Sequence, residues 1–301
     1  MTTSAEPELV LAADATLGEC PGWDPATGTL LWIDWAGQEV HRWDPATDID
    51  VTYPVGQDIG AVVRHAGGGL MCALRDGVAR LDESTGQWEM VAPIEADRPG
   101  NRANDGKVDR AGRFWVGTTA DNEAPGAGGL YRLELDGSVT TVLVDCTMSN
   151  GQDWSPDDRL MYFADTLTYR VDVFDYDAAT GAVTNRRPFA EIDPANGMPD
   201  GLCVDADGGV WVALWGGWAV RHYAPNGRLL DVYKFPVSHV TSLAFGGEDM
   251  ADLYVTTAWM DDSGMRTPEQ KAAQPLAGGL FRLRPGPKGQ RPNAYGAATP
   301  D

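Results

Sequence analysis

Four polar side chains of the types that bind hard metal ions occur at nearly the same distance before a bulky apolar or aromatic residue. Glu19, Asn104, Asn150 and Asp200 each lie 11 to 13 residues before a bulky residue at the centre of an apolar segment. Carboxylate and amide oxygens suit Ca²⁺, Mg²⁺ or Mn²⁺ better than softer metals, and Zn²⁺ or Fe²⁺ is an alternative. Asn-Gly and Asp-Gly also mark turns, which is the other interpretation of each dipeptide taken alone. The shared phase favours one divalent-cation site.

The bulky residues belong to a repeat that runs through the chain. Six apolar segments follow Gly-rich or Asp-rich turns, and each precedes a second segment with period-two alternation. Their central residues are Trp32, Met71, Trp115, Tyr162, Trp211 and Tyr254. Units of about 45 residues, each with room for roughly four strands, are typical of β-propeller blades. We therefore predict an all-β fold, a six-bladed β-propeller in a single domain over residues 1–301, with frayed ends at about 1–6 and 290–301.

The propeller supplies the positions that the four polar side chains need. The innermost strands of all blades line the central channel in the same direction, so equivalent residues form a ring at one mouth. The two remaining blades place Gly60 and Ser242 at this position, which adds space and a weak hydrogen bond but no charge. Helices play little part, since only one short helix is expected, near 267–273.

Charge and composition exclude several classes of protein. With 23 basic and 44 acidic residues the net charge is −21, which disfavours nucleic-acid and membrane partners. The start of the chain lacks the pattern of a secretion signal. The four cysteines lie more than fifty residues apart, as expected for reduced thiols in a cytoplasmic protein. We expect a small-molecule substrate and no obligate protein partner. The histidines are dispersed, as expected for packing, and no Gly-x-Ser-x-Gly elbow is present.

Several motifs together resemble one known family. They are Leu17-Gly-Glu-Cys-Pro-Gly-Trp-Asp24, Arg102-Ala-Asn-Asp-Gly-Lys107, Gly112-Arg-Phe-Trp-Val-Gly-Thr118, Ser149-Asn-Gly-Gln-Asp-Trp-Ser-Pro-Asp157, Pro199-Asp-Gly201, Phe245-Gly-Gly247 and Leu253-Tyr-Val-Thr-Thr257. The chain is similar, from about residue 9 to 283, to the senescence marker protein / gluconolactonase / luciferin-regenerating enzyme family, which includes regucalcin. Each motif is weak alone, and the combination is specific.

The resemblance implies a six-bladed propeller with one divalent cation in its channel, Ca²⁺ first among the candidates, and hydrolysis of sugar lactones. Matched motif by motif, it implies Glu19, Asn150 and Asp200 as cation ligands. It also implies that Arg102 and Asn104 hold the substrate.

The chain departs from this family at one substrate position. Regucalcin-like members place acidic residues after the Gly-Thr-x-Ala stretch, where this sequence has Asp121-Asn122. Asn122 is therefore a candidate contact for a sugar hydroxyl, and the departure makes a different lactone or a non-sugar substrate easier to accommodate.

Our leading hypothesis is a metal-dependent lactonase acting on a sugar lactone such as gluconolactone. The cation polarises the carbonyl and activates water, and Asp200 is the candidate general base. One alternative is a non-enzymatic calcium-binding regulatory propeller. Another is a hydrolase of the same fold that acts on organophosphate or other non-sugar esters.

Overall fold

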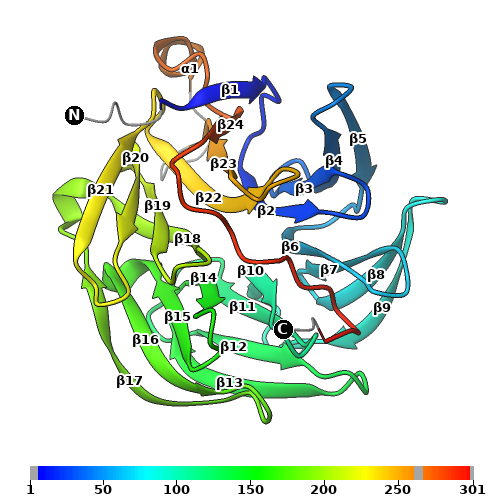
Figure 1. Ribbon diagram of the computed structural model, residues 1–301. Helices are drawn as coiled ribbons and strands as arrows, with labels where there is room; N and C mark the ends of the chain where they lie inside the picture. The colour runs from blue at the N-terminus through cyan, green and yellow to red at the C-terminus, as the bar shows by residue number, and fades with distance from the viewer. Residues whose placement is uncertain (1–5, 261–266, 299–301) are drawn as a thin grey trace.

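Six four-stranded antiparallel sheets surround a central axis in the computed structural model, which describes residues 6–260 and 267–298 (Figure 1). The prediction of a six-bladed β-propeller is therefore confirmed. Each blade is numbered here by its order around the ring, and its strands follow one another from the axis outward.

The first three blades are built from consecutive segments of the chain. Blade 1 contains β2 (Gly18–Asp24), β3 (Thr29–Asp34), β4 (Glu39–Asp44) and β5 (Ile49–Pro54). Blade 2 contains β6 (Ile59–Arg64), β7 (Leu70–Leu74), β8 (Gly77–Asp82) and β9 (Gln87–Pro93). Blade 3 contains β10 (Asn101–Val108), β11 (Phe114–Ala120), β12 (Gly128–Leu133) and β13 (Val139–Cys146).

The next two blades repeat this order, and the last one departs from it. Blade 4 contains β14 (Ser149–Trp154), β15 (Leu160–Asp165), β16 (Arg170–Asp177) and β17 (Ala182–Glu191). Blade 5 contains β18 (Met198–Val204), β19 (Val210–Trp215), β20 (Ala219–Tyr223) and β21 (Leu229–Lys234). Blade 6 contains β22 (His239–Gly246), β23 (Asp252–Ala258), β24 (Leu280–Leu283) and β1 (Glu8–Leu11).

Blade 6 joins the two ends of the chain. Its outer strand β1 comes from the N-terminus and pairs antiparallel with β24, in a register that places Glu8 opposite Arg282. The Arg282 guanidinium also donates a hydrogen bond to the Glu8 carboxylate over 2.8 Å. The ring of blades is thus closed by hydrogen bonds between the first and last strands.

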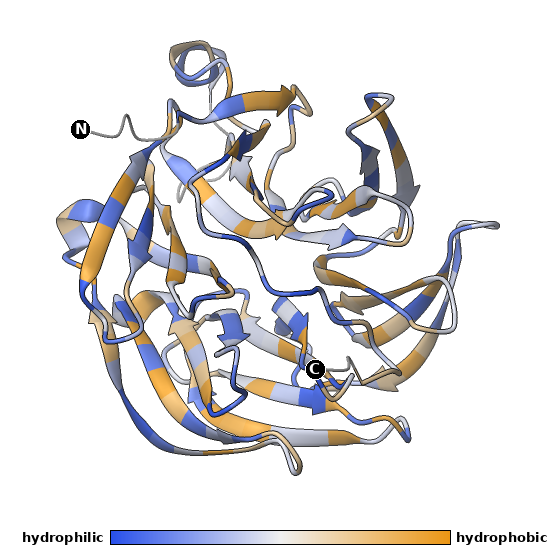
Figure 2. Ribbon diagram, viewed as in Figure 1, coloured by the Kyte–Doolittle hydropathy of each residue, from blue (hydrophilic) through white to orange (hydrophobic). Residues whose placement is uncertain are grey.

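The second strand of each blade forms the core, as the repeat predicts. All six central bulky residues are at most 2% exposed, because each lies between two neighbouring blades. Residues exposed on outer strands include Val51 of β5 and Leu229 of β21. Figure 2 shows hydrophobic and hydrophilic residues interleaved along many of the strands, as expected for half-buried sheets.

Histidines contribute to packing, as their dispersed positions indicate. The His41 ring stacks on Trp32 with centroids 3.8 Å apart, and His222 stacks on Trp211 at 3.9 Å. The indole of Trp211 donates to Asp205 Oδ2 over 2.8 Å. These contacts fix the core of two blades.

A C-terminal strap, residues 285–298, crosses one mouth of the pore from blade 6 toward blade 2 (Figure 1). Its hydrogen bonds reach five blades. Gly289 N donates to Met250 O of blade 6, and Lys288 O accepts from Ala206 N of blade 5. The side chains of Gln290 and Asn293 donate to Trp154 O of blade 4 and Val108 O of blade 3, and Tyr295 N donates to Arg64 O of blade 2. The expectation of a frayed end from residue 290 is therefore wrong for residues 290–298. Residues 1–5 and 299–301 of the expected frayed ends lie outside the described residues.

Tyr295 explains why the strap is held. It is 7% exposed, packs into the core of blades 2 and 3, and donates its hydroxyl hydrogen to Glu134 O over 2.8 Å. A buried aromatic residue near the end of a chain anchors the preceding segment.

The expected short helix is present as α1 (Pro268–Ala273), and it begins with a capping box in which the Thr267 side chain accepts from Gln270 N. Two single turns of 3₁₀-helix, Thr166–Thr168 and Pro194–Asn196, complete the described elements. Among the described residues, no helix combines the length and the apolar character that crossing a bilayer requires.

Candidate active site in the pore

The four predicted polar residues all lie on innermost strands. Glu19 is in β2, Asn104 in β10, Asn150 in β14 and Asp200 in β18. Gly60 of β6 and Ser242 of β22 take the same level in the other two blades. Because all six inner strands start at the same mouth, these residues form a ring near that mouth.

A β-bulge marks the ring level in every blade. The register between first and second strand shifts at Glu19/Gly22, Ile59/Ala61, Ala103/Asp105, Ser149/Gln152, Pro199/Leu202 and Val240/Leu243. A bulge inserts one extra residue and re-aims the side chains beside it. Six bulges at one level therefore turn polar side chains of different blades toward the axis.

Glu19, Asn150 and Asp200 are brought together from blades 1, 4 and 5. The Asn150 side chain donates a hydrogen bond to Asp200, which lowers the pKa of that carboxyl. The Asn150 amide also donates to Thr166 Oγ1 over 3.0 Å. With its nitrogen engaged in this way, the amide oxygen of Asn150 is available as a ligand.

Burial and mutual repulsion disfavour the charged form of the carboxyl groups in the ring. Burial, followed by the charges of Asp200 and Asp105, raises the pKa of Glu19 well above its ordinary value. Burial and the charge of Asp105 also raise the pKa of Asp200. All three carboxyl groups are less than 10% exposed. A divalent cation between them would relieve both the desolvation and the repulsion.

The donor set fits a hard cation. Glu19 and Asp200 offer carboxylate oxygens and Asn150 an amide oxygen, which are the ligand types of Ca²⁺ and Mg²⁺. Among the described residues, no group of three or more His, Cys, Asp or Glu side chains is arranged to hold a metal ion. A cation held by Glu19 and Asp200 would therefore need the amide oxygen of Asn150 as a third protein ligand.

Arg102 and Asn104 form one unit beside the ring. Arg102 Nη1 donates to Asn104 Oδ1 over 3.0 Å, and the guanidinium lies over the Trp35 ring, 4.4 Å from its centroid. Asn104 Nδ2 donates to Ser149 O over 3.1 Å, which ties it to the next blade. Burial lowers the pKa of Arg102 to about 10, so the guanidinium is still charged at neutral pH.

Asn122 lies at the edge of the site. It is exposed in the turn after β11, and its Oδ1 accepts from Ala124 N within that turn. The neighbouring Asp121 forms an ion pair with Arg75, 3.0 Å apart. The charges of Asp121 and Glu123 act on Arg102, so this turn borders the mouth of the pore. The structure does not join Asn122 to the ring by a direct contact among the described residues.

Two residues of the site were not singled out from the sequence. Asp105 is 7% exposed and its charge acts on both Glu19 and Asp200. Burial raises the pKa of Asp105 to about 6. Trp35 forms the platform under Arg102. Asp105 lies within the Arg-x-Asn-Asp-Gly-Lys motif. In a regular strand, period-two alternation would point its side chain away from that of Asn104, and the bulge between Ala103 and Asp105 allows both to contribute to the site.

Comparison with known proteins finds relatives that match nearly the whole chain. A family model described as "SMP-30/Gluconolactonase/LRE-like region" matches residues 17–259. The regucalcin of Xenopus laevis is 36% identical, over 97% of this chain and 99% of that protein. A solved calcium-binding regucalcin from Agrobacterium tumefaciens superposes with a TM-score of 0.90 at 31% identity and covers 97% of both chains. A solved luciferin-regenerating enzyme gives a TM-score of 0.89 at 30% identity, over 97% of this chain and 99% of that one.

Proposed function

This chain belongs to the SMP-30/gluconolactonase/LRE-like family, and on that premise we propose that it is a divalent-metal-dependent lactonase that acts on sugar lactones such as gluconolactone. The observation that carries the proposal is the meeting of Glu19, Asn150 and Asp200 at one mouth of the pore. A scaffold alone has no need for two buried carboxylates at repulsive distance.

Glu19, Asn150 and Asp200 would hold the cation, with Ca²⁺ as the first candidate. When bound, such a cation supplies a Lewis acid for the lactone carbonyl and lowers the pKa of water. Asp200 has a second role in our proposal, as the base that accepts a proton from the attacking water. Without a cation, burial and the charge of Asp105 raise the pKa of Asp200. A bound cation would lower this pKa, whereas the charge of Asp105 would still favour the protonated form.

Arg102 and Asn104 would orient the substrate. The Arg102 guanidinium rests on Trp35 and is fixed by Asn104, so it presents its remaining N–H groups in a constant direction. A planar guanidinium can donate two parallel hydrogen bonds to ring and carbonyl oxygens. Fixing the lactone relative to Asp200 reduces the entropic part of the barrier. In this proposal Asn122 contacts an outer hydroxyl of the sugar.

Proton release in a lightly buffered solution tests the function. D-glucono-δ-lactone is added to the untreated protein, to chelator-treated protein, and to treated protein restored in turn with Ca²⁺, Mg²⁺, Mn²⁺, Zn²⁺ or Fe²⁺. We expect release above the spontaneous rate, loss of the excess with chelator, and recovery with at least one metal.

Other results would point elsewhere. Release that is insensitive to the chelator would refute a metal-dependent reaction. Stoichiometric Ca²⁺ binding without turnover of any lactone would favour a calcium-binding regulatory propeller. Faster cleavage of a phosphotriester than of every lactone tested would favour a hydrolase of organophosphate esters.

A further inference from the structure

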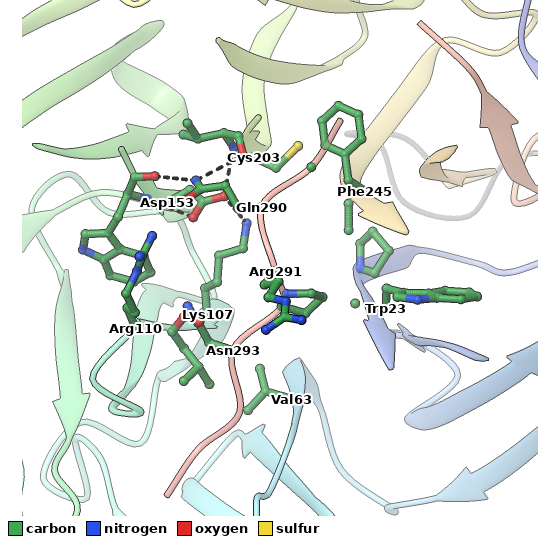
Figure 3. Close-up of a pocket in the computed structure, with 18 of the residues that line it drawn as sticks. Trp23, Val63, Lys107, Arg110, Asp153, Cys203, Phe245, Gln290, Arg291 and Asn293 are labelled. Carbon is green, nitrogen blue, oxygen red and sulfur yellow. Dashed lines mark hydrogen bonds and ion pairs between the residues drawn. The ribbon is translucent and has the colours of Figure 1, made fainter. Parts of the chain in front are cut away.

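A cavity of about 380 Å³ lies at the strap-covered end of the pore, away from the ring. The ring uses the first residues of the inner strands, whereas this cavity is lined by later ones such as Trp23 of β2, Lys107 of β10 and Asp153 of β14. Residues 289–293 of the C-terminal strap close it from outside (Figure 3). Its volume falls within the range of sites for small organic ligands.

One part of the cavity wall is apolar. Trp23, Val63, Phe245 and Pro292 line it. The indole of Trp23 is itself fixed, because it stacks on Tyr254 with ring centroids 5.7 Å apart. A flat apolar body could therefore pack here without reorganisation of the wall.

The charged side chains of the wall have the opposite balance to the rest of the molecule. Four basic residues line the cavity against two acidic ones, in a protein whose net charge is −21: Arg64, Lys107, Arg110 and Arg291 against Asp153 and Asp158. Such a local excess of positive charge attracts anions.

Three of the basic residues are engaged with carboxylates. Lys107 Nζ lies 2.8 Å from Asp153 Oδ2 and donates to Leu202 O over 3.2 Å. Burial disfavours its charge, but Asp153 outweighs this effect and the pKa of Lys107 is raised. Arg110 pairs with Asp158 at 2.8 Å, and Arg64 pairs with Asp24 at 3.4 Å. These groups are charged and held in place.

Arg291 differs from the other three. It is exposed on the strap and has no ion pair within the described part of the chain. Figure 3 shows it between Lys107 and Trp23. The strap on either side is fixed, because Gln290 Nε2 donates to Trp154 O over 2.8 Å and Asn293 Nδ2 donates to Val108 O over 3.0 Å. The part of the strap that crosses the pore is mostly hydrophilic (Figure 2).

A surface hollow adjoins the cavity at the same arginine. A wider hollow of about 840 Å³ on this face shares Trp23, Arg64, Arg291 and Pro292 with the cavity. A ligand from solvent would thus meet Arg291 first and the apolar wall next.

We propose that this strap-covered cavity is a binding site for a small organic monocarboxylate with a ring-sized apolar body. The carboxylate pairs with the Arg291 guanidinium, and the body packs against Trp23 and Phe245. A single unpaired guanidinium matches the two oxygens of one carboxylate. The excess of two basic residues, one of which also faces Asp24, suits a monoanion better than a phosphate dianion. The site is separate from the ring and does not depend on lactone hydrolysis.

Calorimetric titration of the full chain with benzoate tests the site. The protein is treated with chelator so that no cation in the ring competes for the carboxylate. We expect saturable binding at one site per chain, and Arg291→Gln weakens it by about tenfold because a charge-assisted pair is lost. Arg228→Gln is the matched control, since it removes the same charge from an exposed hairpin of blade 5 that does not line the cavity. It leaves the affinity unchanged.

Further variants locate the ligand. Val63→Phe fills the cavity without altering its charges and weakens benzoate binding, whereas Asp200→Asn at the ring leaves it unchanged. The absence of saturable benzoate binding overturns the proposal, as does equal affinity in Arg291→Gln or loss of binding in Asp200→Asn. Inorganic phosphate that binds more tightly than benzoate, with the same dependence on Arg291, overturns the assignment to a carboxylate.

Discussion

The two mouths of one pore are built from the same six inner strands and have opposite properties. At the first mouth the strands bulge, and they gather Glu19, Asp105 and Asp200 into a buried acidic group. At the second mouth basic side chains predominate, and a strap of the chain covers the opening. The distance between these regions is only the length of a strand.

The two mouths differ in whether their charged side chains repel or pair with one another. The acidic mouth keeps like charges close together, which is unfavourable without a cation and would favour the binding of one. The basic mouth pairs most of its charges and is tied to five blades by the strap. The proposed function at the first mouth therefore depends on charge, whereas ion pairs and packing hold the second mouth together.

The largest expected effect is at the acidic mouth. Asp200→Asn removes the proposed base and a cation ligand together, so lactone turnover falls by about 10³-fold while the fold is retained. Asp207→Asn makes the same change in an exposed turn at the other end of the same inner strand, and its turnover stays at the wild-type level. Rates from proton release and circular dichroism spectra check both variants. An Asp200→Asn protein with wild-type turnover removes this residue from the mechanism.

Asp105, at the acidic mouth, is the basis of a predicted pH dependence of stability. Its folded pKa of about 6 lies above its ordinary value of 3.8, so the folded chelator-treated protein keeps a proton that the unfolded chain releases. Wild-type protein therefore loses stability relative to Asp105→Asn as the pH rises from about 4 to about 6. The loss amounts to roughly 3 kcal/mol.

Urea unfolding at several pH values measures this difference. The charge of Asp105 also raises the pKa of Glu19 and Asp200, so the difference between the two proteins measures all the effects of this charge on stability. Parallel stability profiles for the two proteins would show that Asp105 is not the source of strain.

A smaller effect is expected at the strap. Tyr295→Phe keeps the buried ring and removes the hydrogen bond from its hydroxyl to Glu134 O, so the free energy of unfolding falls by about 1 kcal/mol. Lactone turnover and cation affinity stay unchanged, because Tyr295 lies far from the ring in the fold. Thermal unfolding and the proton-release assay provide the two readouts. A parallel drop in turnover would mean that the two mouths are coupled.

The smallest effect is expected for Asn122→Ala. If Asn122 donates one neutral hydrogen bond to an outer hydroxyl, KM for the lactone rises about threefold and kcat does not change. Steady-state kinetics on a sugar lactone and on a lactone without that hydroxyl provide the comparison. An unchanged KM for both substrates removes Asn122 from the substrate contacts.

The fold could be predicted because its signals are local and repeated. Bulky residues such as Trp115 and Trp211 occur at a nearly constant spacing, and alternation around them identifies the strands. The ring residues followed from counting back to the start of each blade, since inner strands share one direction. Glu19, Asn150 and Asp200 are indeed brought together, although their roles stay predictions.

Other features could not be derived in this way. Asp105 escaped notice because a bulge breaks the alternation that its position would suggest. The strap was predicted to be a frayed end, because the burial of Tyr295 depends on a surface of blades 2 and 3 that is distant in sequence. Arg291 carries no local signal at all, because its neighbours come from other blades.

The pairing of β1 with β24 delays closure of the propeller during synthesis. During synthesis, residues 8–11 are made about 270 residues before their partners at 280–283. Blades 1 to 5 can assemble earlier as an open arc. The backbone groups on one edge of β23 stay unpaired until β24 is made. A nascent chain that stalls before this point cannot close the propeller, and its exposed strand edge can pair with another chain and aggregate.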